Sequence, residues 1–204
     1  MIKGERFNGI SHLVGAALAL AGTVVLVVSA SQSGGTRRVV AFSVYGASLS
    51  LLYLVSALYH SLEGRAKQVF RVLDHQAIYL LIAGSYTPFV LVTLNGNGGW
   101  WMFGAIWGMA VLGLVLDALP LRGPRVLPLI LYLSMGWLVL LALRPLLAVL
   151  PFRGFLWLLA GGLFYTAGVL FFVLDRRYPW MHGVWHLFVL AGSTCHYVAI
   201  LFYV

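Results

Sequence analysis

Three histidines and one aspartate have the residue types and spacing of a metal site. The segment His182-Gly-Val-Trp-His186 places two imidazoles four residues apart. On a helix, this spacing puts both on one face, where they can bind one ion. Ser56 and His60 repeat the spacing, and Asp74 follows in the next apolar stretch. Three histidine ligands with an open fourth position are typical of catalytic zinc, and a nearby carboxylate can orient or deprotonate the zinc-bound water.

The elements that must position these residues are membrane helices, because the composition excludes a soluble domain. The chain has 204 residues, of which 62% are hydrophobic and only 9% are charged, whereas soluble domains are about 45–50% apolar and about 25% charged. The formal net charge is +8, but the basic residues lie in small groups between apolar runs. This pattern favours membrane-flanking charge and argues against nucleic acid as a partner. The single cysteine, Cys195, lies in an apolar stretch and is interpreted as a small core residue.

Seven apolar stretches are long enough to cross a bilayer, which takes about 20 residues. They predict an all-α membrane protein in which residues 1–204 form a single seven-helix transmembrane domain. Short interruptions predict antiparallel neighbours in a compact bundle. We expect the first stretch to be kept as a span rather than cleaved as a signal peptide, and Arg144-Pro145 favours an early end to the fifth helix. The expected spans are residues 9–30, 39–61, 70–94, 100–119, 126–149, 154–174 and 181–203.

The basic residues predict the orientation of this bundle, since cytoplasmic loops carry an excess of lysine and arginine. With seven spans, the N-terminus and the even-numbered loops share one side of the membrane. That side carries nine basic residues and the other carries four. We therefore predict a cytoplasmic N-terminus and a C-terminus outside. The nine are Lys3, Arg6, Arg65, Lys67, Arg71, Arg122, Arg125, Arg176 and Arg177, and the four are Arg37, Arg38, Arg144 and Arg153.

This topology brings polar residues of five helices to the cytoplasmic end of the bundle. An ionisable side chain inside a membrane span is costly, so each one needs a partner or a function. His196 lies deeper, about 20 Å along its helix from His182 at about 1.5 Å per residue. The residues expected at the shared depth are His12, His60, Asp74, Asp117 and His182.

Other interpretations of these residues stay open. His12 and His75 also fit interfacial positions that face headgroups or water. Asp74 and Asp117 also fit pairing with basic loop residues, and for Asp117 we favour a loop arginine such as Arg122. For the three histidines of the second and seventh spans we favour metal binding. They fall at one depth, and no other group in the chain is placed to neutralise so many buried imidazoles.

Four stretches carry the motifs of a known family. They are Glu5-Arg-Phe-Asn-Gly-Ile-Ser-His12, Ser56-Ala-Leu-Tyr-His60-Ser61, residues 73–89 and residues 182–196. In these stretches, which occur in the family's order and are spread over nearly the whole chain, the sequence resembles the haemolysin III family, the bacterial branch of the progestin and adipoQ receptor superfamily. The resemblance implies seven helices in the bacterial inner membrane with a cytoplasmic N-terminus. His12 and His196 match family positions that are not zinc ligands in the receptor branch, and their roles stay open.

The resemblance also implies one zinc ion, bound by His60, His182 and His186. The receptor branch and the related alkaline ceramidases resemble intramembrane zinc amidohydrolases. By analogy we expect hydrolysis of an amide or ester bond in a lipid-derived substrate, with membrane lipids as partners. Asp74 is the expected general base. Ser56 is expected to donate a hydrogen bond to a zinc ligand or to the developing oxyanion.

Two other functions fit the same residues. A receptor or regulator of lipid state would use structural zinc, with a fourth protein ligand such as His12. The longest predicted loop on the cytoplasmic side has only about eight residues, which counts against a built-in output domain. A transporter or pore is the third hypothesis, with proton movement along His186, Ser193 and His196. The sequence leaves the oligomeric state open.

Overall fold

The computed structural model describes residues 4–33, 35–96, 98–119 and 126–204, and these residues form helices and short connections without a strand. Seven helical stretches are long and apolar enough to cross a membrane, which confirms the predicted all-α, seven-helix membrane fold. The elements are α1 (Arg6–Ser33), α2 (Thr36–Ser61), α3 (Gly64–Pro88), the π-helical η1 (Phe89–Thr93), α4 (Gly99–Ala118), α5 (Val126–Gly136), the 3₁₀-helical η2 (Leu138–Ala142), α6 (Leu143–Val149), α7 (Phe152–Leu174) and α8 (Met181–Tyr203).

The helices turn apolar side chains outward and pack on one another through small residues. Leu18 and Leu170 are each 65% exposed, as expected where the surrounding solvent is hydrocarbon. Lipid tails are as apolar as leucine, so helix association depends on close contact rather than on hydrophobic transfer. Gly46 of α2 provides such contact. A Cβ atom at this position would lie 2.5 Å from the methyl carbon of Thr23 in α1.

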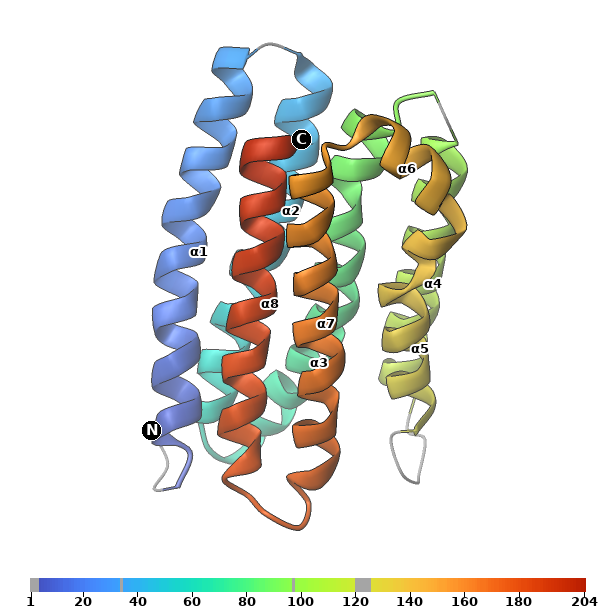
Figure 1. Ribbon diagram of the computed structural model, residues 1–204. Coiled ribbons are helices and arrows are strands. Elements are labelled where there is room, and N and C mark those ends of the chain that lie inside the picture. The colour runs from blue at the N-terminus through green and yellow to red at the C-terminus, as the bar shows by residue number, and fades with distance from the viewer. Residues whose placement is uncertain (1–3, 34, 97, 120–125) are drawn as a thin grey trace.

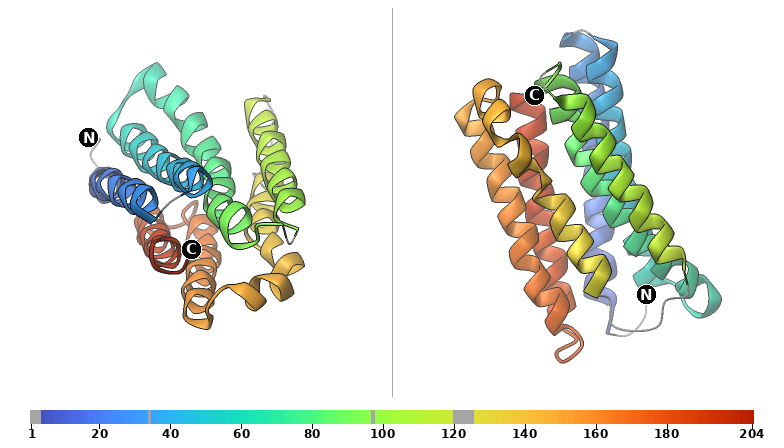
Figure 2. Two further views of the ribbon diagram at one scale, coloured as in Figure 1. Left: turned by 90° about the horizontal axis from the view of Figure 1, so that it is seen from above. Right: turned by 90° about the vertical axis from the view of Figure 1, so that its right-hand side faces the viewer.

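The arrangement of the helices brings the ends of α1, α2 and α8 together. Figures 1 and 2 show α2 packed between α1 and α3, and α7 beside α8. The α4–α5 pair stands to one side and contacts the bundle mainly through α3. The N-terminus and the turn between α7 and α8 lie at one end, and the C-terminus lies at the other (Figure 1). A cytoplasmic N-terminus stays a prediction, and its charge count includes Lys3, Arg122 and Arg125, which lie outside the described residues.

The fifth span is interrupted at η2, before the Arg144-Pro145 pair that the sequence marks as a helix end. Pro145 lies in the first turn of α6, where a residue without an N–H group is tolerated. At the break, the Tyr86 hydroxyl donates to the Gly136 carbonyl (2.9 Å) and accepts from the Val139 N–H (2.8 Å). Backbone groups freed inside a membrane must be satisfied within the protein. Tyr86 therefore stabilises the interrupted helix.

The substitution Tyr86→Phe tests this role. It leaves a carbonyl and an N–H group at the break without their partner, so we expect the free energy of unfolding to fall by about 1–3 kcal/mol. Detergent-induced unfolding in mixed micelles, followed by circular dichroism, measures the change. Tyr178→Phe is the control, because Tyr178 lies exposed in the turn before α8 and its change should stay within about 0.5 kcal/mol. Equal stability of Tyr86→Phe and the wild type would contradict the assignment.

Candidate metal centre

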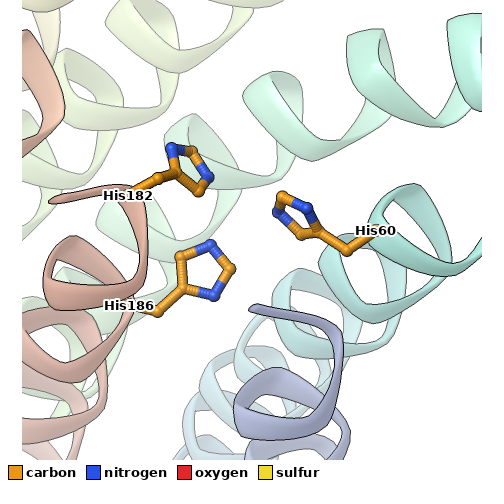
Figure 3. A group of neighbouring side chains, drawn as sticks. All are labelled: His60, His182 and His186. Atoms are coloured by element: carbon orange, nitrogen blue, oxygen red, sulfur yellow. The ribbon is translucent and has the colours of Figure 1, made fainter. Parts of the chain in front are cut away.

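Three histidines from two helices converge at the end of the bundle that holds the N-terminus. His60 lies in the last turn of α2, and His182 and His186 lie in the first two turns of α8. Figure 3 shows the three rings gathered around one point. Their centroids are 4.8 to 5.2 Å apart, and one ligand nitrogen from each lies within 4.8 Å of the other two. The structure thus brings together the three predicted metal ligands in a group that could hold a metal ion.

The chemistry of this group fits a metal ion. Imidazole nitrogen is a common ligand for zinc and other first-row transition metals. The Nε2 atom of His60 is buried and has no hydrogen-bond partner among the described residues. Buried polar atoms in folded proteins almost always have a partner. A cation bound between the three rings would supply one for this nitrogen.

Two carboxylates that the sequence did not single out hold two of the histidine rings. Glu5 Oε2 lies 3.1 Å from His60 Nδ1 and 2.6 Å from Lys67 Nζ. Asp175 Oδ2 lies 2.7 Å from His182 Nδ1. A ligand histidine usually donates its second ring N–H to a carboxylate, which fixes the ring orientation and leaves the other nitrogen for the metal. Glu5 and Asp175 are placed to do this for His60 and His182.

The environment of Glu5 keeps this carboxylate charged. Partial burial by itself raises the pKa of Glu5, but hydrogen bonds with Lys67 and His60 outweigh burial, and the pKa lies below its ordinary value. A charged acceptor strengthens the bond to the His60 N–H. The sequence offered one signal for Glu5, its place in the first motif, but only the fold shows that it contacts a residue 55 positions away.

His12 lies against the histidine group without belonging to it. Its ring stacks on His186 with centroids 3.6 Å apart and an interplanar angle of 18°, and it meets the edge of Tyr53 at 5.0 Å. Only 3% of His12 is exposed, so it is buried rather than interfacial. Ser11 Oγ, from the same turn, lies 3.4 Å from His186 Nδ1. The start of α1 therefore fixes the position of the His186 ring.

A cavity of about 400 Å³ opens beside the histidines. Ser56 and Asp74, the predicted catalytic residues, line it together with His75. Ser56 is buried, and Asp74 and His75 are half-buried. Asp117 is not among the residues that line this cavity, although the sequence places it at the same depth. Its predicted partner Arg122 lies outside the described residues, and the catalytic roles of Ser56 and Asp74 stay predictions.

Two apolar cavities lie deeper in the bundle, the first beside this polar cavity and the second beside the first. The first has a volume of about 120 Å³ and lies between α3, α5, α7 and α8. The second has a volume of about 110 Å³ and reaches η1, η2 and α6 near the opposite end. The polar cavity and the first apolar cavity share the lining residues Leu52, Ile78, Phe172, Trp185 and Val189.

The deeper polar residues of α8 bond to neighbouring helices. The Ser193 hydroxyl lies 2.8 Å from the Tyr53 hydroxyl of α2 and 2.7 Å from the Tyr165 hydroxyl of α7. His196 Nε2 donates to the Leu158 carbonyl of α7 at 3.2 Å. These bonds join α8 to α2 and α7 in the interior of the bundle.

The fold and the site define a seven-helix membrane protein with a three-histidine candidate metal centre. The family described as Haemolysin-III related matches residues 1–197. The chain is 44% identical to Hemolysin-3 of Bacillus cereus over 204 residues, which are 100% of this chain and 93% of that protein. It is 38% identical to the Hemolysin-3 homolog of Bacillus subtilis (strain 168) over 203 residues, 99% and 95% of the two chains.

A human protein is also similar. The chain is 33% identical to the Monocyte to macrophage differentiation factor of Homo sapiens over 166 residues, which are 77% of this chain and 67% of that protein. Together with the bacterial relatives, the family match confirms the resemblance noted in the sequence. The protein belongs to the haemolysin III family of multi-pass integral membrane proteins.

Metal analysis of the detergent-purified protein tests the histidine group. We expect about one metal ion per chain in the wild type, and loss of the ion in both His60→Ala and His186→Ala, because each change removes one of three ligands. Elemental analysis by mass spectrometry gives the stoichiometry. His196→Ala is the matched control, since this histidine of α8 bonds to Leu158 instead. A folded wild type purified without chelator and free of metal would contradict the site.

Removal of the two carboxylates tests their positioning role. Glu5→Gln and Asp175→Asn keep the size of each side chain but remove its charge. We expect metal affinity to fall by about 10–100-fold, as for other histidine-bound metal sites that lose such a partner. Competition with a chromophoric chelator measures the affinity. Glu63→Gln is the control, because Glu63 is exposed before α3. Affinities that match the wild type in both variants would show that the carboxylates do not support the ligands.

Proposed function

We propose that this protein is a zinc-dependent hydrolase that cleaves an amide or ester bond in a lipid-derived substrate. One observation carries the proposal. The polar cavity with the three histidines and Asp74 adjoins an apolar cavity between membrane helices, with which it shares five lining residues. A lipid has the same two parts, a polar group with a hydrolysable bond and an alkyl chain. The resemblance to the receptor branch and to alkaline ceramidases supports this reaction class by analogy.

The residues that would hold zinc are His60, His182 and His186. Zinc supplies Lewis acidity, which polarises a carbonyl group and lowers the pKa of water. The protein contributes the orientation of the ligands. Glu5 and Asp175 bond the Nδ1 atoms of two of the rings, which directs their other nitrogens to a common point.

Asp74 and Ser56 are assigned the proton transfer and the stabilisation of charge. The oxygen of a water molecule attacks the substrate carbonyl carbon, and the carboxylate of Asp74 accepts its proton. The bond from the carbonyl carbon to nitrogen or oxygen then breaks, and Asp74 returns the proton to the leaving amine or alcohol. Ser56 donates a hydrogen bond to the oxygen that gains negative charge. The position of both residues on the wall of the polar cavity supports these roles.

The substitution Asp74→Asn tests the mechanism. Asparagine has nearly the same size but accepts no proton, so we expect turnover to fall by about 10²–10⁴-fold while metal content stays unchanged. The assay is the release of fatty acid from a panel of N-acyl amide and ester lipids by the zinc-loaded protein in nanodiscs. Asp117→Asn is the control, since Asp117 does not line the polar cavity, and it should retain turnover. Unchanged turnover in Asp74→Asn would reject the mechanism.

One contact favours a second function, a receptor or regulator of lipid state with structural zinc. His12 stacks on His186 beside the cavity. It is outside the group of three whose ligand atoms converge, and a turn of its ring toward them would make it a fourth ligand and close the site. X-ray absorption spectroscopy of the zinc-loaded protein separates the two functions. Four nitrogen ligands, reduced to three in His12→Ala, would favour the regulator, and three nitrogens with one oxygen would favour the hydrolase. A transporter or pore is a weaker alternative, because Ser193 and His196 bond to neighbouring helices.

A further inference from the structure

The two apolar cavities meet at a junction where two of the lining residues are glycines. These glycines come from the end of α5 and from the middle of α7, and the other residues of the junction come from α3, α8 and the turn before η2. The residues that line both cavities are Ser85, Tyr86, Gly136, Trp137, Gly162 and His196.

The four side chains at the junction are each held by a hydrogen bond. An apolar membrane interior offers few alternative partners, so a side chain that moved aside would leave polar atoms unsatisfied. The width of the junction therefore depends on the two positions that have no side chain. The bonds run from Ser85 Oγ to the Leu81 carbonyl (2.7 Å), from the Tyr86 hydroxyl to the Gly136 carbonyl (2.9 Å), from Trp137 Nε1 to Thr166 Oγ1 (3.1 Å) and from His196 Nε2 to the Leu158 carbonyl (3.2 Å).

The space beside the two glycines is open. Apart from its chain neighbours and its own helix backbone, a Cβ atom at Gly136 or Gly162 would have no heavy atom within 4 Å, whereas one at Gly161, next to Gly162, would collide with the His196 ring. Gly104 and Gly108 of α4 are equally open. Like Gly136 they are exposed, but they line neither apolar cavity. Gly104 and Gly108 therefore provide matched open positions in a helix outside the junction.

The junction lies at a defined distance from the histidine group. His186 and His196 are ten residues apart on α8, which corresponds to about 15 Å along the helix. An extended alkyl chain covers this distance with roughly a dozen carbon–carbon bonds. A shorter chain that starts at the histidines ends in the first apolar cavity, and a longer chain that follows α8 reaches the two glycines.

We propose that Gly136 and Gly162 determine the length of the alkyl chain that the protein accepts, by keeping open the passage to the second apolar cavity. The proposal rests on the proposed function, in which these cavities hold the chain of the lipid substrate. Lipid and detergent tails are as apolar as the cavity walls, so an alkyl chain gains little free energy simply by leaving them for the cavity. Selection among chain lengths therefore depends on whether the chain fits the cavity. A leucine at either position adds four carbon atoms to a junction between cavities of about 120 and 110 Å³.

Displacement of radiolabelled hexadecanoic acid from the detergent-purified, full-length protein tests the proposal. The unlabelled competitors are octanoic, dodecanoic and hexadecanoic acid. In Gly162→Leu and Gly136→Leu we expect the affinity for hexadecanoic acid, relative to octanoic acid, to fall at least about tenfold, because only the longer acid must pass the junction. Labelled octanoic acid measures the short-chain affinity directly in each variant. Gly162→Ala should give a smaller change in the same direction.

The control Gly108→Leu adds the same side chain at an open glycine outside the cavities. It should leave the ratio of the affinities for hexadecanoic and octanoic acid at its wild-type value. The ratio also separates selectivity from general damage to the fold, which weakens both acids together. An unchanged ratio of the two affinities in both junction variants would overturn the proposal, and this includes the case in which both acids bind more weakly to the same extent.

The result of this binding experiment is independent of the turnover assay that tests the proposed hydrolase. Binding of fatty acids requires no turnover, so it can be measured in the metal-loaded protein and in Asp74→Asn. A changed ratio without hydrolysis of any lipid would leave the chain-length role in place and remove the reaction. Hydrolysis with a wild-type ratio in the junction variants would retain the reaction and remove the role of the glycines.

Discussion

Each imidazole in the histidine group has two ring nitrogens that need partners where little water is available, and the rest of the site is arranged to supply them. The Nδ1 atoms of His60, His182 and His186 lie against Glu5, Asp175 and Ser11. These partners come from the region before α1, the turn before α8 and the first turns of α1. The group therefore depends on the close association of three chain segments, which the small-residue contacts between helices permit. A metal ion between the rings would satisfy the remaining nitrogens.

The same end of the bundle joins polar and apolar space. Asp74 and Ser56 line the cavity beside the histidines, and the first apolar cavity adjoins it between α3, α5, α7 and α8. The interrupted fifth span borders both apolar cavities, and Tyr86 satisfies its free backbone groups. A continuous helix would need no such partner. The break thus places Gly136 and Trp137 on the cavity wall without leaving the Gly136 carbonyl and the Val139 N–H unpaired.

The sequence predicted the helices and the three histidines but not the residues that support them. Spans follow from the length of apolar runs, and His182 and His186 share a face because a helix repeats every 3.6 residues. Glu5 and Asp175 were missed because a charged residue beside a membrane span usually faces headgroups or water. Asp117 was placed at the depth of the histidines, yet it does not line the polar cavity. Depth along a helix specifies how far a residue lies from the membrane surface, but not the direction in which it points.

The sequence by itself determined the class of the protein, the number of its spans and its family, because these depend on composition, on local periodicity and on motifs within single helices. Tertiary structure decided which polar residues meet, where the fifth span is interrupted and how the cavities connect. Those features depend on the rotation of each helix about its axis and on contacts between residues as far apart as Ser11 and His186. Such contacts leave no local periodicity in the sequence, since many different residues satisfy the same packing in a membrane.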